Sequence, residues 1–245
     1  ETGPRGAHPR AYCTTPAEMP DLIDRLRDAS GDRLAIVTIA PELPGSVELI
    51  GRLAGDGLCV ALGHHQASAE QIRQAADAGA RLATHLGNGS HQQLPRLDNY
   101  LQTQLAEDRL MASFIADGHH MPLTTLQNFL RAKTFERSIL VTDAMLAAEL
   151  APGEYPFGGR ATVVREDGRV FRRGEDNLAG SSATLDACVR NACRGAGVGF
   201  EQAWAMASTN PCRLLNLPPR PEVSVTISDD GFRTDRRSGA DRRQG

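Results

Sequence analysis

The chain has 245 residues, of which 40% are hydrophobic and 23% charged, and its formal net charge is -3. This length suits one domain of the α/β-barrel kind, or one and a half ordinary domains, with a sizeable core. The composition argues against wholesale disorder and against nucleic acid as the main partner. No apolar run approaches the roughly 20 residues of a membrane helix, so no membrane partner is expected. The five cysteines are scattered without a C-x-x-C pair. This favours free thiols and a cytoplasmic location over a disulfide framework or a zinc finger.

Short apolar stretches alternate with helical patterns as far as residue 142. Helical spacing is visible in Ser68–Ala78 and Pro122–Ala132. Such alternation predicts βα units and a parallel sheet, and therefore an α/β fold built as a partial (β/α) barrel. The expected strands are Leu34–Ala40, Leu58–Leu62, Ala80–Thr84, Met111–Ala116 and Ser138–Thr142.

The pattern changes after Asp143. Alternating residues on either side of Asp167-Gly168 predict a β-hairpin over Ala161–Arg173. Two helices are expected after the hairpin, at Ala183–Arg194 and Phe200–Ser208. A lone strand is expected at Glu222–Ser228, followed by a disordered arginine-rich tail at Phe232–Gly245.

Polar residues follow each of the five expected strands. The four later strands end in imidazoles or carboxylates, and Glu42 follows the first; the later groups are His64-His65, His85, Asp117 with His119-His120, and Asp143. In parallel βα architectures, ligands and catalysis gather at the carboxyl ends of the strands. Imidazoles from two adjacent strands suit Zn²⁺ or a similar divalent ion, and a nearby aspartate can accept a proton from water. We expect at most one histidine of each adjacent pair to point inward.

Several motifs, in their order and spacing, resemble those of the N-acetylglucosamine-6-phosphate deacetylases, which are amidohydrolases. The resemblance covers roughly residues 1 to 217. The segments that carry it are Glu1–Pro9, Val37–Glu42, Gly63-His64, Thr84–Leu86, Ile115–His120, Leu140–Ala144, Leu178–Ser181 and Asn210-Pro211.

The resemblance implies a role for each matching residue. Glu1, His64 and His85 match the metal ligands, Asp143 matches the acid–base residue, and His8 matches the histidine that polarises the acetyl carbonyl. His120, Asn88, Gly89 and Arg96 match the residues that contact the sugar phosphate. One divalent ion, expected to be zinc, is implied. A site bridged by a carboxylated lysine is not expected, because the only lysine, Lys133, lies in a helical pattern and follows no strand.

The resemblance also implies a domain organisation. An amidohydrolase barrel domain is expected over 1–217, and a short strand with the arginine-rich tail over 218–245. The family carries a long segment before the position of Glu1, so a truncated barrel of about five strands is expected. The loop Gly87–Ser90 differs from the Phe-Asn-Ala-Met typical of the family.

The expected activity is metal-dependent hydrolysis of N-acetylglucosamine 6-phosphate to glucosamine 6-phosphate and acetate. A related amidohydrolase acting on another N-acyl substrate remains an alternative. So does a non-catalytic barrel that binds sugar phosphate or a partner chain. The partner is expected to be a small amino-sugar substrate rather than nucleic acid or a membrane, and the protein could assemble as a homodimer.

Overall fold

Five parallel strands form the central sheet, and each lies within a predicted apolar stretch. They are β1 (Ile36–Ile39), β2 (Cys59–Leu62), β3 (Ala80–Ala83), β4 (Met111–Ile115) and β5 (Ser138–Val141), hydrogen-bonded in the order β1-β2-β3-β4-β5. The computed structural model describes residues 5–31, 33–157, 160–218, 224–228 and 231–235. Because Ile39 pairs with Leu62 and Leu62 with Ala83, the carboxyl ends of these strands share one edge of the sheet. The predicted parallel sheet of five strands is confirmed.

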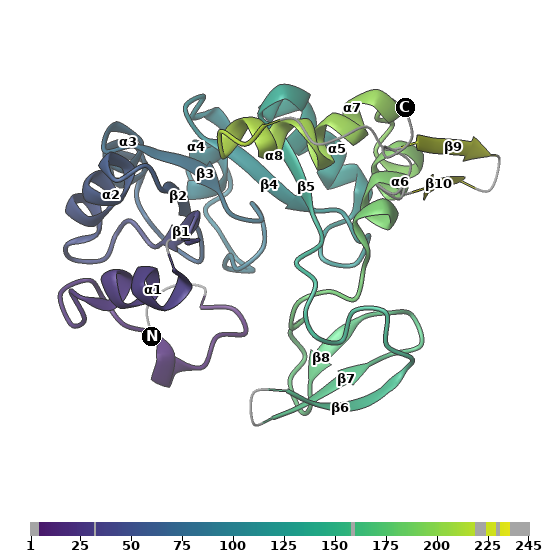
Figure 1. Ribbon diagram of the computed structural model, residues 1–245, viewed down its shortest axis with the longest axis horizontal. Coiled ribbons are helices and arrows are strands. Elements are labelled where there is room, and N and C mark those ends of the chain that lie inside the picture. The colour runs from purple at the N-terminus through teal and green to yellow at the C-terminus, as the bar shows by residue number, and fades with distance from the viewer. Residues whose placement is uncertain (1–4, 32, 158–159, 219–223, 229–230, 236–245) are drawn as a thin grey trace, which may run out of the picture.

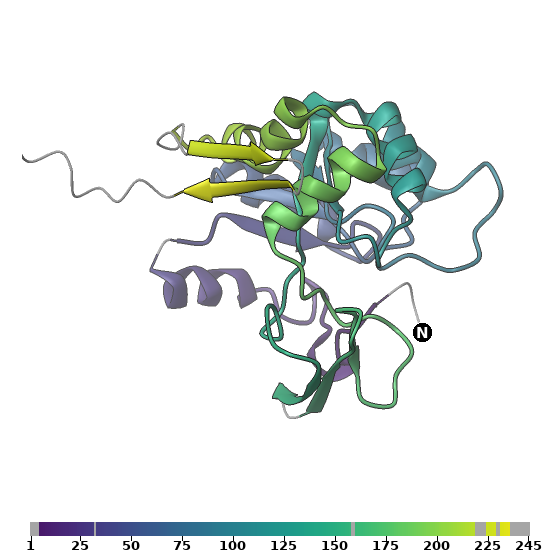
Figure 2. The same cartoon turned by 90° about the vertical axis from the view of Figure 1, so that its right-hand side faces the viewer.

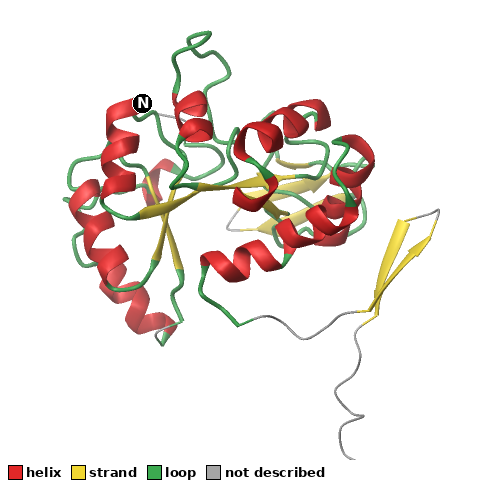
Figure 3. Cartoon of the chain, turned by 90° about the horizontal axis from the view of Figure 1, so that it is seen from above, coloured by secondary structure: helices red, strands yellow, loops and turns green. Residues whose placement is uncertain are grey.

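Helices connect the strands and cover one face of the sheet (Figures 1 and 3). Helix α1 (Leu22–Ser30) precedes β1, and α2 (Ser46–Gly55), α3 (Ala69–Asp77), α4 (Tyr100–Ala106) and α5 (Leu123–Lys133) alternate with the strands. Helix α3 lies in the expected helical stretch, and Ser68 caps it by forming a capping box with Gln71. Short 3₁₀ turns lie at η1 (Arg10–Tyr12) and η2 (Phe135–Arg137).

Both faces of the sheet are buried. On the helical face, Val60 and Leu62 pack with Ile72, all fully buried. The opposite face carries Cys59, Ala61, Leu82 and Ile139, against which Leu214 and Leu215 pack at the end of α8 (Thr209–Leu214). Burial on two faces explains why β2, β4 and β5 are apolar rather than alternating, whereas β1, at the edge of the sheet, keeps Ile36 exposed.

A three-stranded antiparallel sheet follows β5 and lies apart from the main sheet in Figure 1. It consists of β6 (Gly153–Phe157), β7 (Arg160–Val164) and β8 (Val170–Arg172). The predicted hairpin is confirmed as β7 and β8. Strand β6 was not predicted, because it is largely exposed and contains Pro156, which leaves no alternating pattern.

The C-terminal part is helical and ends in a hairpin. The two predicted helices are present as α6 (Leu185–Gly195) and α7 (Phe200–Ala207). The expected lone strand is instead paired, since β9 (Ser224–Ser228) forms an antiparallel ladder with β10 (Gly231–Asp235), seen as two yellow strands in Figure 2. The rest of the predicted disordered tail, 236–245, lies outside the described residues. Nowhere in the described chain does a helix have both the length and the apolar character to span a bilayer.

Candidate active site

Three of the predicted site residues have a left-handed backbone where strands end. The φ angles are 54° at His64, 31° at His85 and 51° at Asp143. Non-glycine residues seldom adopt this region, and such outliers cluster at functional sites. These turns place the two imidazoles and the carboxylate at the carboxyl edge of the sheet.

Neighbouring strands hold these turns in place. The His85 N–H donates to Ser113 Oγ at 2.7 Å, and the Ser181 N–H donates to the Asp143 carbonyl at 2.9 Å. Glu42 contributes at the end of β1, where its Oε1 accepts the Gln66 N–H at 2.9 Å. Hydrogen bonds from Ser113, Ser181 and Glu42 therefore fix the segments that carry the site.

The rings of His8, His64 and His85 form a contiguous array. His64 Nε2 lies 3.0 Å from His85 Nε2, and the ring centroids of these two residues are 4.7 Å apart. His8 is exposed and meets His64 edge-on at 4.9 Å between centroids. Burial lowers the pKa of His85, which keeps its imidazole neutral and able to donate a lone pair.

His120 is held by a buried side-chain hydrogen bond with Asp117. The distance from Asp117 Oδ2 to His120 Nδ1 is 2.7 Å, with side chains only 4% and 9% exposed, respectively. Asp117 Oδ1 also accepts the backbone N–H groups of His119 and His120, each at 2.9 Å. Burial alone would raise the pKa of Asp117, but these hydrogen bonds outweigh it and hold the pKa below its usual value. His120 is thus fixed in orientation, whereas His119 is exposed, as expected for a pair with one inward member.

Asp143 is open to solvent at its edge, yet the surrounding protein desolvates its carboxyl group. This desolvation raises the pKa of Asp143, against the opposing charges of His120, His64 and His8. A carboxyl group with a raised pKa accepts and returns a proton more readily near neutral pH.

The loop after His85 carries the other predicted substrate residues. Gly89 packs under His64 so closely that a Cβ there would lie 2.5 Å from His64 Nδ1. Asn88 follows the turn, where its N–H donates to the His85 carbonyl at 2.8 Å. Arg96 is exposed further along the loop and forms no ion pair with any described residue. Asn88 and Gly89 are therefore brought to the site, while no contact joins Arg96 to the imidazoles.

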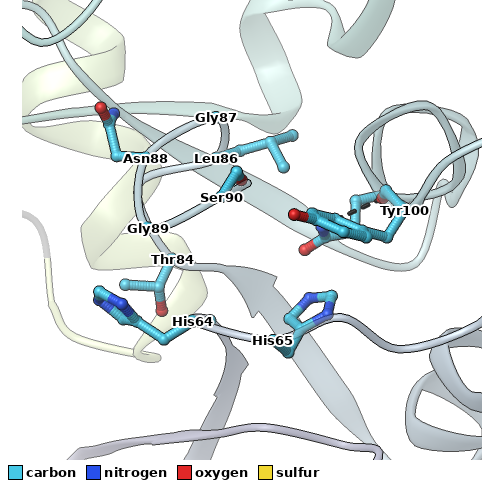
Figure 4. A pocket seen from close by; sticks show the side chains of 11 residues that line it. His64, His65, Thr84, Leu86, Gly87, Asn88, Gly89, Ser90 and Tyr100 are labelled. Carbon is cyan, nitrogen blue, oxygen red and sulfur yellow. Dashed lines mark hydrogen bonds between the residues drawn. The ribbon is translucent and has the colours of Figure 1, made fainter. Parts of the chain in front are cut away.

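A cavity of about 10 Å³ lies between this loop, the end of β2 and α4 (Figure 4). His65 turns away from His64 into this region and is buried, with Nδ1 accepting the Ala67 N–H at 3.2 Å. Its Nε2 and Asn88 Nδ2 are buried without a hydrogen-bond partner. A cavity of this size suits one water molecule, which would accept from both nitrogens.

The predicted ligand Glu1 lies outside the described residues. Among residues 5–31, 33–157 and the other described ranges, no group of three His, Cys, Asp or Glu side chains is arranged to hold a metal ion. Of the three predicted metal ligands, the structure therefore describes two, the imidazoles of His64 and His85. Two residues of the site were not predicted: Ser113, which holds the backbone of His85, and Tyr100, which lines the cavity. The available signal for Ser113 was that it is the single hydroxyl residue inside the apolar stretch Met111–Ala116.

The chain is similar to sugar-phosphate deacetylases over most of its length. It is 31% identical over 230 residues to the N-acetylglucosamine-6-phosphate deacetylase of Lysinibacillus sphaericus, covering 94% of this chain and 58% of that protein. It is 35% identical over 235 residues to the N-acetylgalactosamine-6-phosphate deacetylase of Escherichia coli O157:H7, covering 93% and 61%. The human N-acetylglucosamine-6-phosphate deacetylase is 36% identical over 223 residues, covering 87% and 53%.

Solved structures agree. The N-acetyl-D-glucosamine-6-phosphate deacetylase of Mycobacterium smegmatis, solved in complex with N-acetyl-D-glucosamine-6-phosphate, matches with a TM-score of 0.79 and 32% identity, covering 88% of this chain and 57% of that one. The enzyme of Thermotoga maritima matches with a TM-score of 0.75 and 26% identity, covering 87% and 56%. The expected amidohydrolase barrel class, present here as a five-stranded part, is confirmed.

No protein-family model matches the chain. The chain spans somewhat more than half the length of the curated relatives named above. The sequence identity and the structural matches together identify this chain as a homologue of the N-acetylglucosamine-6-phosphate deacetylases.

Proposed function

We propose that this chain hydrolyses the N-acetyl amide of an amino-sugar 6-phosphate with the help of one divalent metal ion. The observation that carries the proposal is the approach of two imidazole nitrogens, His64 Nε2 and His85 Nε2, to 3.0 Å at adjacent strand ends. Asp143 lies at the same edge of the sheet, with a raised pKa.

The paired imidazoles fit a divalent metal. Two nitrogens that each lie about 2.1 Å from zinc are about 3.0 to 3.4 Å apart, and His64 and His85 match the lower end of this range. Neutral imidazoles are donors that Zn²⁺ accepts readily. We assign His64 and His85 as ligands and Glu1 as the third. A bound divalent ion supplies Lewis acidity, which activates water and polarises an amide carbonyl.

The remaining residues are assigned by their chemistry. Asp143 takes a proton from the attacking water and returns it to the amine nitrogen, which must be protonated to leave. His8, exposed beside His64, donates a hydrogen bond to the acetyl oxygen as negative charge develops there. His120, fixed by Asp117, orients the sugar.

The substrate is proposed to be phosphorylated at the sugar 6-position. Gly89 offers its backbone N–H beside His64, Asn88 offers its unpartnered side-chain Nδ2, and Arg96 offers an exposed guanidinium on the same loop. Phosphate is a strong acceptor for both kinds of donor. N-acetylgalactosamine 6-phosphate is a second candidate, because the relative named for that sugar is 35% identical to this chain. The two sugars differ only in the configuration of the C4 hydroxyl.

The test combines metal analysis with acetate release. The purified chain is loaded with zinc and freed of excess metal. Acetate release is then measured with N-acetylglucosamine 6-phosphate, N-acetylgalactosamine 6-phosphate, the two unphosphorylated sugars and an N-acetyl amino acid. We expect about one zinc per chain and acetate release from a 6-phosphate. Release only from the amino acid would favour a different amidohydrolase. A folded, zinc-loaded chain that is inert on the whole panel would support a non-catalytic barrel.

A further inference from the structure

The loop between β3 and α4 holds the residues proposed to bind the phosphate, so its order matters for affinity. Residues 87–99 carry Asn88, Gly89 and Arg96 and contain no helix or strand. A loop of this length costs conformational entropy if a ligand has to order it. What holds the loop in place before substrate binds therefore influences how tightly phosphate is held.

Tyr100 holds the middle of this loop. Its hydroxyl oxygen accepts the His91 N–H at 2.9 Å and lies 3.0 Å from His91 Nδ1. The tyrosine is the first residue of α4 and is only 8% exposed, whereas His91 is exposed. The contact therefore ties an exposed piece of loop to a buried, helical side chain.

The surroundings fix the tyrosine itself. Its ring lies 5.5 Å from the ring of His65 at the end of β2, and Figure 4 shows its hydroxyl directed at the loop. The Asn99 side chain caps α4 by accepting the N–H groups of Leu101 and Gln102. The same side chain donates from Nδ2 to the Pro95 carbonyl at 2.8 Å, which holds the far end of the loop.

We propose that Tyr100 is a positioning residue that preorders the loop 87–99 for the sugar phosphate. The proposal rests on the proposed function, since it assigns Tyr100 a part in phosphate affinity. Tyr100 contacts the loop through His91, and through His91 it positions the Asn88 side-chain amide and the Gly89 N–H. Its loss should weaken binding of the phosphorylated sugar without slowing the chemical step.

Tyr100→Phe removes the hydroxyl and keeps the ring against His65. Two hydrogen bonds of ordinary net strength correspond to about a thirtyfold change in an equilibrium constant. We expect KM for the N-acetyl-amino-sugar 6-phosphate to rise by up to about thirtyfold with kcat unchanged, and the kinetics of the unphosphorylated sugar to stay the same. His91→Ala removes only the Nδ1 contact and leaves the backbone hydrogen bond. The KM of this variant for the phosphorylated sugar should therefore lie between those of wild type and Tyr100→Phe.

Tyr155→Phe is the matched control. The Tyr155 hydroxyl likewise hydrogen-bonds to the backbone, here by donating to the Ala151 carbonyl at 2.8 Å, but it lies in the antiparallel sheet. This variant should leave KM unchanged. The proposal is overturned if Tyr100→Phe leaves KM for the phosphorylated sugar unchanged, or if it lowers kcat for both sugars equally.

A second measurement keeps this test separate from the test of activity. Amide hydrogen exchange on the full chain reports loop order with no substrate present. We expect faster exchange over residues 87–98 in Tyr100→Phe and unchanged exchange there in Tyr155→Phe. An inert wild-type chain in which this difference is seen would refute the proposed function and retain the loop anchor; equal exchange in all variants would refute the anchor itself.

Discussion

Replacing Lys133 with methionine tests how the fold accommodates a buried cation. Lys133 in α5 is fully buried, and its Nζ donates to the carbonyls of Gln104 at 2.9 Å and Glu107 at 2.6 Å, at the end of α4. Burial, with a smaller contribution from Arg137, lowers its pKa from 10.5 to about 8, while Asp108 and Glu107 act in the opposite direction.

The sign of the pH effect follows from this lowered pKa. Below pH 8 both the folded and the unfolded chain keep the proton on Lys133. Between about pH 8 and 10.5 the unfolded chain binds more protons at this site, so its contribution to the free energy of unfolding rises with pH. The full rise corresponds to about 3 kcal/mol.

The assay is urea unfolding of wild type and Lys133→Met at pH 7 and pH 10. Methionine fills the space but does not titrate, and other groups that titrate in this range are common to both proteins. The difference in unfolding free energy, wild type minus variant, should increase by up to about 3 kcal/mol from pH 7 to pH 10. Parallel pH profiles would refute the argument and show that Lys133 reaches solvent in the folded state.

Three further substitutions probe the site. Asp143→Asn should keep zinc and substrate binding while turnover falls by about 10²–10⁴-fold, and near-normal turnover in the zinc-loaded variant would place the proton transfer elsewhere. In Gly89→Ala, the added Cβ would lie 2.5 Å from His64 Nδ1 at a φ of 60°, so zinc content after dialysis should fall; full retention would contradict the close packing. In Gly63→Ala, the added Cβ would lie 2.9 Å from Thr84 Cβ, so we expect thermal unfolding to show a destabilisation of about 1–3 kcal/mol. An unchanged Tm would contradict this expectation.

The sequence predicted the strands because each lies in a short apolar run, and the parallel order then placed His64, His85 and Asp143 at one edge. Their left-handed backbone could not be predicted, since histidine and aspartate carry no marker for positive φ comparable to glycine. The role of Tyr100 was equally hidden. Its partner His91 lies in a loop with no periodic pattern, and their contact depends on how that loop folds back.

Helices α2 and α4 were missed for a related reason. Helix α2 begins after Gly45 without a side-chain cap. Helix α4 is capped by Asn99, but it has only seven residues, too few to show a helical pattern. The site residues matched through the family resemblance depend on spatial neighbours in the same way. Asn88 and Gly89 reach the imidazoles because their loop turns back at once, whereas Arg96 lies further along.

The strand order β1-β2-β3-β4-β5 has a consequence for how the protein opens locally. Neighbours in the sheet are also neighbours along the chain, so each βα unit is stabilised mainly by the units on either side. Two of the proposed zinc ligands, His64 and His85, belong to the second and third units, and Asp143 belongs to the fifth. Zinc stabilises only conformations in which its ligands are in place, so its protective effect should be strongest around β2 and β3 and decline toward β5. The metal half of the site can therefore persist through fluctuations in which the proton-transferring half is momentarily lost.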